Sequence, residues 1–169
     1  TITNSGTATG FGGGKIGQVV QATKTDTASI ASATFVDLGF SGAITPSATS
    51  SKIFVLFSMS ISAISGQRAG LKLLRDSTDL LIGDAAGSRI RATHMILSQF
   101  GVTSSISFQC LPTVVSYLDS PSTTSETTYK IQAFCESADD FKINASPGDS
   151  DNSTYSRSAS SIILMEVLA

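Results

Sequence analysis

Two alternating runs separated by one turn constrain the fold of this chain more than any other feature. They occupy residues 106–134, ISFQCLPTVVSYLDSPSTTSETTYKIQAF, where apolar residues recur at every second position in 106–110 and in 129–133, and where Val114, Ser116 and Leu118 share one face before the turn. This period of two indicates strands with one face in a core and one face in water. The intervening Asp119-Ser120-Pro121 predicts a turn, because Asp and Ser bond their own backbone and Pro fixes φ and lacks a donor.

Short extended segments follow one another along the rest of the chain at hairpin spacing. Strands are predicted at 16–24, 34–37, 40–45, 53–61, 69–74, 78–82, 141–143 and 161–168. Gly39 is expected to kink the chain, 26–33 to form a loop, and 83–105 to form a long loop with a short strand inside. Only a weak helical pattern within 90–99 competes. About nine strands predict an all-β, antiparallel β-sandwich, jelly-roll-like, over residues 15–169.

Two predicted strands are apolar on both faces, which indicates that both of their faces are covered. In 53–61 the odd-numbered residues form one apolar face, and Phe54 and Leu56 make the other face apolar as well. The second cover could be a loop or another subunit, so Phe54 and Leu56 are the candidate trimer-interface residues. The segment 161–168 is interrupted only by Glu166 and predicts a central strand.

Hydroxyl groups rather than charges supply most of the polar surface. The chain of 169 residues is 41% hydrophobic but only 14% charged, and Ser and Thr exceed a quarter of it. Such a surface permits close contact in an oligomer at little desolvation cost. A net charge of −2 with scattered Lys and Arg argues against nucleic-acid binding. No apolar run reaches the roughly 18 residues that a membrane helix needs, so membrane insertion is not expected.

The first 14 residues have a different composition from the rest. They are mainly Thr, Ser and Gly and end in Phe11-Gly12-Gly13-Gly14. Such a run cannot bury enough apolar surface to order itself, so 1–14 is interpreted as a flexible linker or the end of a stalk. It lacks the charged and apolar regions of a signal peptide, and is compatible with a piece cut from a longer chain.

Three short motifs suggest a phosphate-binding, a hydrolytic or a calcium-binding site, but each lacks other residues or the spacing that such a site needs. Gly12-Gly13-Gly14-Lys15 is followed by Ile16 and a strand, where a phosphate loop needs Ser or Thr and a helix. Gly148-Asp149-Ser150 matches the nucleophile block of a small esterase family, but its flanks are loop-like and His94 is the only histidine. The aspartates within 139–151 lack EF-hand spacing. We therefore expect no catalytic residue, bound metal or cofactor.

Cys110 and Cys135 lie in or beside strands that could pair. We interpret them as thiols that pack as small hydrophobic groups. A disulfide remains the alternative if the chain works outside a reducing compartment. Without a histidine cluster, two cysteines cannot close a structural zinc site.

The irregular segment 83–105 holds the candidate recognition residues, since loops of this length in compact domains are typically functional or mobile. Arg89, Arg91, His94 and Phe100 could form an exposed surface for a carboxylated sugar or a partner protein. The alternative is that the apolar residues around 95–97 make one more strand.

Several short sequence runs, taken in order, form a recognisable set. They are GKIGQVVQ (14–21), ITPS (44–47), SSKI (50–53), LKLLRD (71–76), GDAAGSR (83–89), LDSP (118–121), TTYK (127–130) and ILMEV (163–167). This ordered set resembles the C-terminal domain of tail-fibre and related virion structural proteins of marine bacteriophages, including cyanophages. The similarity covers most of 14–169 and is weakest over 91–103, while 1–10 resembles the end of the preceding repetitive stalk.

The resemblance implies a β-sandwich head that forms a homotrimer on a thin stalk and contacts other virion proteins. It implies a non-enzymatic role in virion structure or in binding a host-surface glycan or protein, in a particle made in the host cytoplasm. A monomeric carbohydrate-binding module is the alternative, although the absence of Trp and the presence of only three Tyr disfavour stacking on sugars. A capsid decoration or cement protein, or a depolymerase that depends on His94, is a further possibility.

Overall fold

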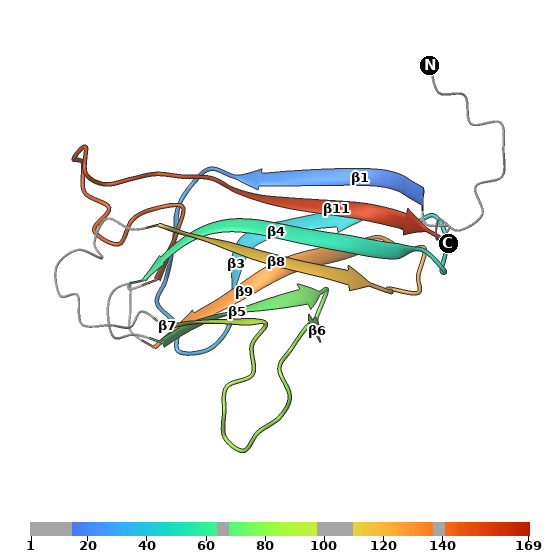
Figure 1. The fold of residues 1–169 in the computed structure, drawn as a ribbon, viewed down its shortest axis with the longest axis horizontal. Helices are drawn as coiled ribbons and strands as arrows, with labels where there is room; N and C mark the ends of the chain where they lie inside the picture. Colours follow the sequence, from blue (N-terminus) through green and yellow to red (C-terminus); the bar gives the residue numbers. More distant parts are fainter. Residues whose placement is uncertain (1–14, 64–67, 98–109, 137–140) are drawn as a thin grey trace, which may run out of the picture.

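A computed structural model describes residues 15–63, 68–97, 110–136 and 141–169 (Figure 1). The strands are β1 Lys15–Lys24, β2 Ala28–Ile30, β3 Val36–Ile44, β4 Lys52–Ala63, β5 Arg68–Arg75, β6 Thr78–Leu80, β7 His94–Leu97, β8 Leu111–Asp119, β9 Thr127–Cys135, β10 Phe141–Ile143 and β11 Ser160–Leu168. The described residues form no helix, and hence none long and apolar enough to cross a membrane.

The strands form two antiparallel sheets, which lie as two layers in Figure 1. Sheet A has the order β1-β11-β4-β10-β2, with β8 paired to β4, and sheet B has the order β3-β9-β5-β6, with β7 paired to β5. β11 pairs with residues 52–58 of β4 and β10 with residues 61–63, so both lie on the side of β4 opposite β8. The predicted all-β antiparallel sandwich is confirmed.

The core lies between the sheets and is built from the alternating residues that predicted the strands. In β4, Ile53, Val55 and Phe57 are fully buried, and they face a layer from sheet B that includes Leu73 and Ile131. The central position predicted for 161–168 is confirmed, because β11 lies between β1 and β4.

The structure differs from the predicted strands at β2 and around Gly39, and it decides between the alternatives for 83–105. β2 forms within the predicted loop 26–33, because Ala28–Ile30 pairs with β10. β7 is the short strand expected inside 83–105, and it occupies the weak helical pattern. The predicted strands around Gly39 are one strand, β3, whose pairing with β9 shifts register between Asp37 and Ser41. Gly39 has a φ of +63°, a left-handed conformation that glycine adopts without a steric penalty.

β8 ends where Asp119-Ser120-Pro121 predicted a turn, and a second turn joins β5 to β6. β5 and β6 are joined at Asp76, whose φ of +52° suits a tight turn. β8 ends at Asp119, which is buried and accepts hydrogen bonds from Arg75 at 2.8 and 2.9 Å and from the Tyr129 hydroxyl at 2.7 Å. Burial, and then the Asp119 carboxylate, raise the pKa of Tyr129. These bonds join the end of sheet A to β5 and β9 of sheet B. The predicted linker 1–14 and the alternating residues 106–109 lie outside the described residues.

Candidate functional site

The outer surface of sheet A carries a row of apolar side chains across four strands. Val19 of β1 is opposite Met165 of β11, Met165 is opposite Phe54 of β4, and Phe54 is opposite Leu118 of β8. Directly opposed residues of antiparallel strands project from the same face. Because the adjacent Ile53 is buried in the core, the row projects outward.

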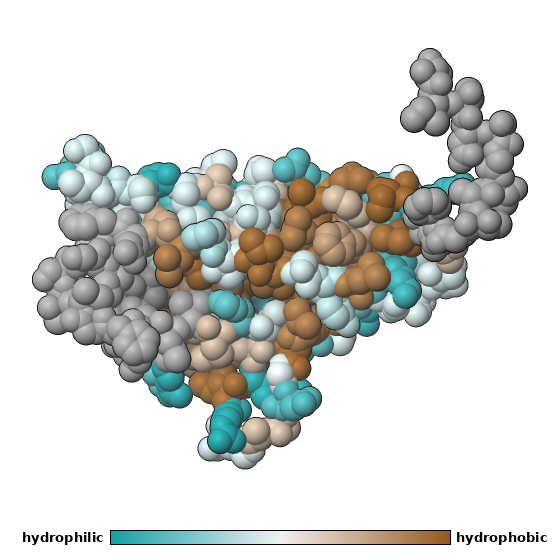
Figure 2. Space-filling view, in the orientation of Figure 1, coloured by the Kyte–Doolittle hydropathy of each residue, from teal (hydrophilic) through white to brown (hydrophobic). Residues whose placement is uncertain are grey.

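Neighbouring positions extend this row into a patch. Ile163 is opposite Leu56, and Ile16 is opposite Val167, on the same outer side. The patch, called here the apolar face, comprises Ile16, Val19, Phe54, Leu56, Leu118, Ile163, Met165 and Val167. Ile16, Val19 and Leu118 are 53%, 57% and 46% exposed, and the other five are half-buried. Figure 2 shows apolar residues gathered over β1, β11, β4 and β8.

The outer surface of sheet B has the opposite chemistry. Lys72 pairs with Asp79 at 2.7 Å, and Lys130 pairs with Asp37 at 2.8 Å. Gln132 donates a further hydrogen bond to Asp37 at 2.7 Å. An antiparallel sheet that covers a core on one side normally presents such polar groups on the other. Sheet A departs from this rule, and large exposed apolar patches mark interaction sites.

The predicted interface residues Phe54 and Leu56 both lie on the apolar face, half-buried between their neighbours on β11 and β8. Sequence reasoning missed Val19, Leu118 and Met165. Each lies in a strand that the sequence pattern predicts, but its alignment with Phe54 depends on the register across four strands.

The predicted recognition residues are brought together only in part. Arg89 and Arg91 are exposed in the connection between β6 and β7, which extends away from both sheets in Figure 1. They donate hydrogen bonds to carbonyls of the same loop, Arg89 to Ala86 at 3.2 Å and Arg91 to Gly83 at 2.7 Å. His94 is exposed at the start of β7. Phe100 lies outside the described residues.

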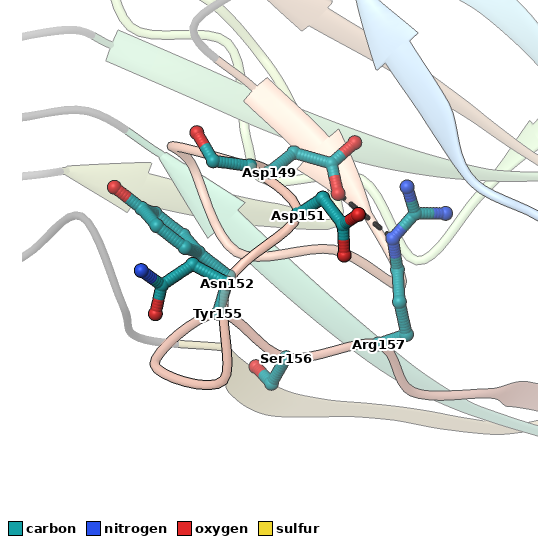
Figure 3. Close-up of a pocket in the computed structure, with 7 residues that line it drawn as sticks. Asp149, Asp151, Asn152, Tyr155, Ser156 and Arg157 are labelled. Atoms are coloured by element: carbon teal, nitrogen blue, oxygen red, sulfur yellow. Dashed lines mark ion pairs between the residues drawn. The ribbon is translucent and has the colours of Figure 1, made fainter.

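A second candidate site is a polar hollow of about 430 Å³ in the connection between β10 and β11 (Figure 3). The side chains around it are Asp149, Ser150, Asp151, Asn152, Tyr155, Ser156 and Arg157. Asp149 forms an ion pair with Arg157, Oδ1 to Nε, at 2.7 Å. Sequence analysis recognised Asp149, Ser150 and Asp151 but missed Tyr155 and Arg157, because no motif contains them.

The hollow does not reproduce the chemistry of the short motifs. Ser150 donates a 3.4 Å hydrogen bond to the carbonyl of Gly148, and His94 lies on β7 of sheet B, outside the lining of the hollow. Within the described ranges, no group of three or more His, Cys, Asp or Glu side chains is placed to hold a metal ion.

The two cysteines pack in different surroundings. Cys135 is fully buried at the end of β9. Cys110 is a reduced, half-buried thiol whose Sγ lies 3.5 Å from the Ser156 hydroxyl at the edge of the hollow.

Glu166 is a buried carboxylate beneath the apolar face, with 1% of its surface exposed. Its Oε1 accepts hydrogen bonds from the backbone N–H and hydroxyl of Ser47, both at 2.6 Å, and its Oε2 accepts one from Gln18 at 2.9 Å. The Ser47 hydroxyl is the main cause that lowers the pKa of Glu166 to about 2. These bonds tie β1 and the β3–β4 connection to β11, which accounts for the buried charge structurally.

A scan against protein-family models finds no match to the chain, and a search of curated proteins finds none either. The apolar face and the polar hollow are therefore the structural features from which a function can be proposed.

Proposed function

We propose that the chain is a non-enzymatic head domain of a bacteriophage tail fibre or related virion fibre, which forms a homotrimer and serves in attachment to the virion or a host surface. The apolar face of sheet A is the observation that carries this proposal. The ordered sequence runs support the assignment to phage virion proteins. A two-sheet sandwich that exposes apolar side chains across four strands suits a subunit whose surface is completed by neighbours.

The chemistry of the face favours a second copy of this chain as its partner. All eight residues of the face are uncharged, and the adjoining outward positions include Gln21, Ser58 and Ser116, with one charged residue, Lys52, opposite Val167. In a cyclic trimer the contact between subunits is heterologous, so the three copies of this face would meet one another only near the three-fold axis, where uncharged groups approach without electrostatic repulsion. Burial of apolar surface contributes about 25 cal/mol per Å² to such an association.

The buried polar groups of the sandwich fit a structural role. Asp119 holds Arg75 and Tyr129 across the two sheets, and Glu166 holds Ser47 and Gln18. Each carboxylate thereby anchors neighbouring segments.

Solution mass tests the assembly directly, with two leucine variants of matched exposure. Leu118 lies on the apolar face and is 46% exposed, whereas Leu81 lies outside the face and is 47% exposed. We expect the wild type and Leu81→Asp to be trimers by light scattering at micromolar concentration. Leu118→Asp is expected to be a folded monomer, because a carboxylate in the contact loses hydration without gaining a partner.

Leu56→Asp extends the test to a half-buried position and should either release monomers or aggregate the protein. A monomeric wild type, or a stable trimer of Leu118→Asp, contradicts the proposed contact. The phage assignment is checked separately by the genomic neighbours of the reading frame, which should encode other virion proteins.

A monomeric carbohydrate-binding module is the second candidate, favoured by the tyrosine in the polar hollow. A monomeric mass combined with glycan binding would select it.

A further inference from the structure

We propose that the polar hollow lined by Asp149, Asp151, Asn152, Tyr155 and Arg157 binds a neutral hexose unit of a surface glycan. This inference rests on the head-domain function proposed above, for which it names a recognition site and a ligand class. It places recognition between β10 and β11 rather than in the loop that carries Arg89 and Arg91.

The position of the hollow suits recognition by a fibre head. Lys15 at the start of β1 pairs with Leu168 at the end of β11, so the chain enters and leaves the described sandwich at one end. The connection between β10 and β11 lies at the opposite end (Figure 1). If residues before β1 form the stalk, the hollow faces away from it.

Buried polar contacts hold the stem of this connection in place. Asn144 is fully buried and donates to the carbonyls of Lys24 at 2.8 Å and Asp26 at 3.0 Å, while Ser160 donates to its Oδ1 at 2.6 Å. Ala145 and Arg157 pair as an isolated antiparallel bridge that closes the loop. A stem fixed in this way lowers the entropic cost of presenting the lining residues to a ligand.

The aromatic ring in the lining is held against the backbone. A Cβ added at Gly148 would lie 2.1 Å from Cε1 of Tyr155, so the ring packs directly on this glycine. Tyr155 is half-buried, and in Figure 3 its ring extends along one side of the hollow, across from the Asp149–Arg157 pair. An aromatic ring provides an apolar surface for the C–H groups of a pyranose.

The polar lining offers both acceptors and donors, as a polyhydroxylated ligand requires. Asp149 and Asp151 accept hydrogen bonds, Asn152 and the serine hydroxyls do both, and Arg157 only donates. The ion pair with Asp149 uses Nε of Arg157, and in Figure 3 the two terminal nitrogens of Arg157 point away from Asp149. A volume of about 430 Å³ falls within the range of small-molecule sites, about 300–1,000 Å³.

The charges disfavour the competing ligand classes. Arg157 neutralises Asp149 at 2.7 Å, which weakens any site for a divalent cation. Two carboxylates against one guanidinium repel phosphates and acidic sugars. A neutral sugar carries no such penalty, and it can hydrogen-bond to both charged groups.

The test compares binding of purified wild-type protein to immobilised neutral oligosaccharides ending in glucose, galactose, mannose or N-acetylglucosamine, and to sialylated and uronic-acid glycans. Free monosaccharides followed by ligand-observed NMR show whether the hexose unit alone suffices. We expect binding within the neutral set. Tyr155→Ala and Asp151→Asn should each weaken it by about tenfold, or about 1.4 kcal/mol.

Two control variants, which should retain binding, separate a loss of the site from a loss of the fold. Tyr155→Phe retains the ring and should bind within about threefold of wild type, a difference below 1 kcal/mol. Asp84→Asn is the same aspartate-to-asparagine substitution at an exposed position outside the hollow, and this variant should bind glycan like wild type. Binding that is unaffected by Tyr155→Ala and Asp151→Asn overturns the proposal.

Two further outcomes overturn the proposal. One is that the wild type binds no glycan of the neutral set. The other is that it binds acidic glycans only, which would favour the loop with Arg89 and Arg91 as the recognition site. Solution mass measured on the same samples separates this result from the fibre-head function. A trimer that binds no neutral glycan refutes only the glycan site, whereas a monomer that binds through Tyr155 refutes only the trimeric head.

Discussion

Among single residues, Glu166 shows how a buried charge is stabilised by hydroxyl and amide donors. Its pKa is lowered to about 2, mainly by the Ser47 hydroxyl, whereas a glutamate in an unfolded chain titrates near about 4.3. A pKa lowered in the folded state means that the contribution to stability is complete above about pH 4.3. It is lost as the pH falls from there toward about 2. We therefore expect the free energy of unfolding to decline over this acidic range.

Glu166→Gln is expected to lower the free energy of unfolding at pH 7 by about 1–3 kcal/mol, because an amide donor would then face the donors of Gln18 or Ser47. The deficit relative to wild type should shrink as the pH is lowered toward 3. Urea unfolding at several pH values measures both effects. Glu126→Gln, at an exposed position, is the control and should change stability by less than about 0.5 kcal/mol. A Glu166→Gln deficit that does not change with pH would contradict the role of the charge.

Among the strands, β3 depends on one glycine conformation. Gly39 has a φ of +63°, and an added Cβ would have no neighbouring atom within 4 Å, so the cost of Gly39→Ala is conformational rather than steric. We expect Gly39→Ala to destabilise the fold by about 1–2 kcal/mol in urea unfolding. Gly83→Ala is the matched control, since it also adds a methyl group to open space, its nearest atom 3.9 Å away, without a positive φ. Equal effects of the two substitutions would show that β3 does not require the left-handed residue.

The strands that could be predicted from sequence are those whose own side chains carry the pattern. β4 and β11 are apolar over most of their length, and β9 alternates, so their strand character is evident locally. β2 has only three residues and is a strand because β10 pairs with it, which is tertiary information. The candidate sites divide in the same way. Phe54 and Leu56 could be identified within one strand, but their continuity with Leu118 depends on register, and the packing of Tyr155 on Gly148 depends on loop closure.

For the whole molecule, the two outer faces of the sandwich should respond differently to salt. Sheet B presents the exposed pairs of Lys72 with Asp79 and Lys130 with Asp37, and screening acts on such charges over about 10 Å at 0.1 M ionic strength. The eight residues of the apolar face carry no charge, and among the residues that the described strands place directly opposite them only Lys52, opposite Val167, is charged. Sulfate strengthens apolar burial because it is excluded from protein surfaces.

The dissociation constant of the proposed trimer should therefore change by less than about threefold between about 0.05 and 0.5 M NaCl, and it should fall in sodium sulfate. Sedimentation equilibrium at each salt concentration measures it. Leu81→Asp should show the same insensitivity to NaCl as wild type, since Leu81 lies off the apolar face. A trimer that dissociates steeply as NaCl rises would instead place the subunit contact on the charged surface of sheet B. In that case the apolar face would need a different occupant, because its side chains would still be exposed in the assembled oligomer.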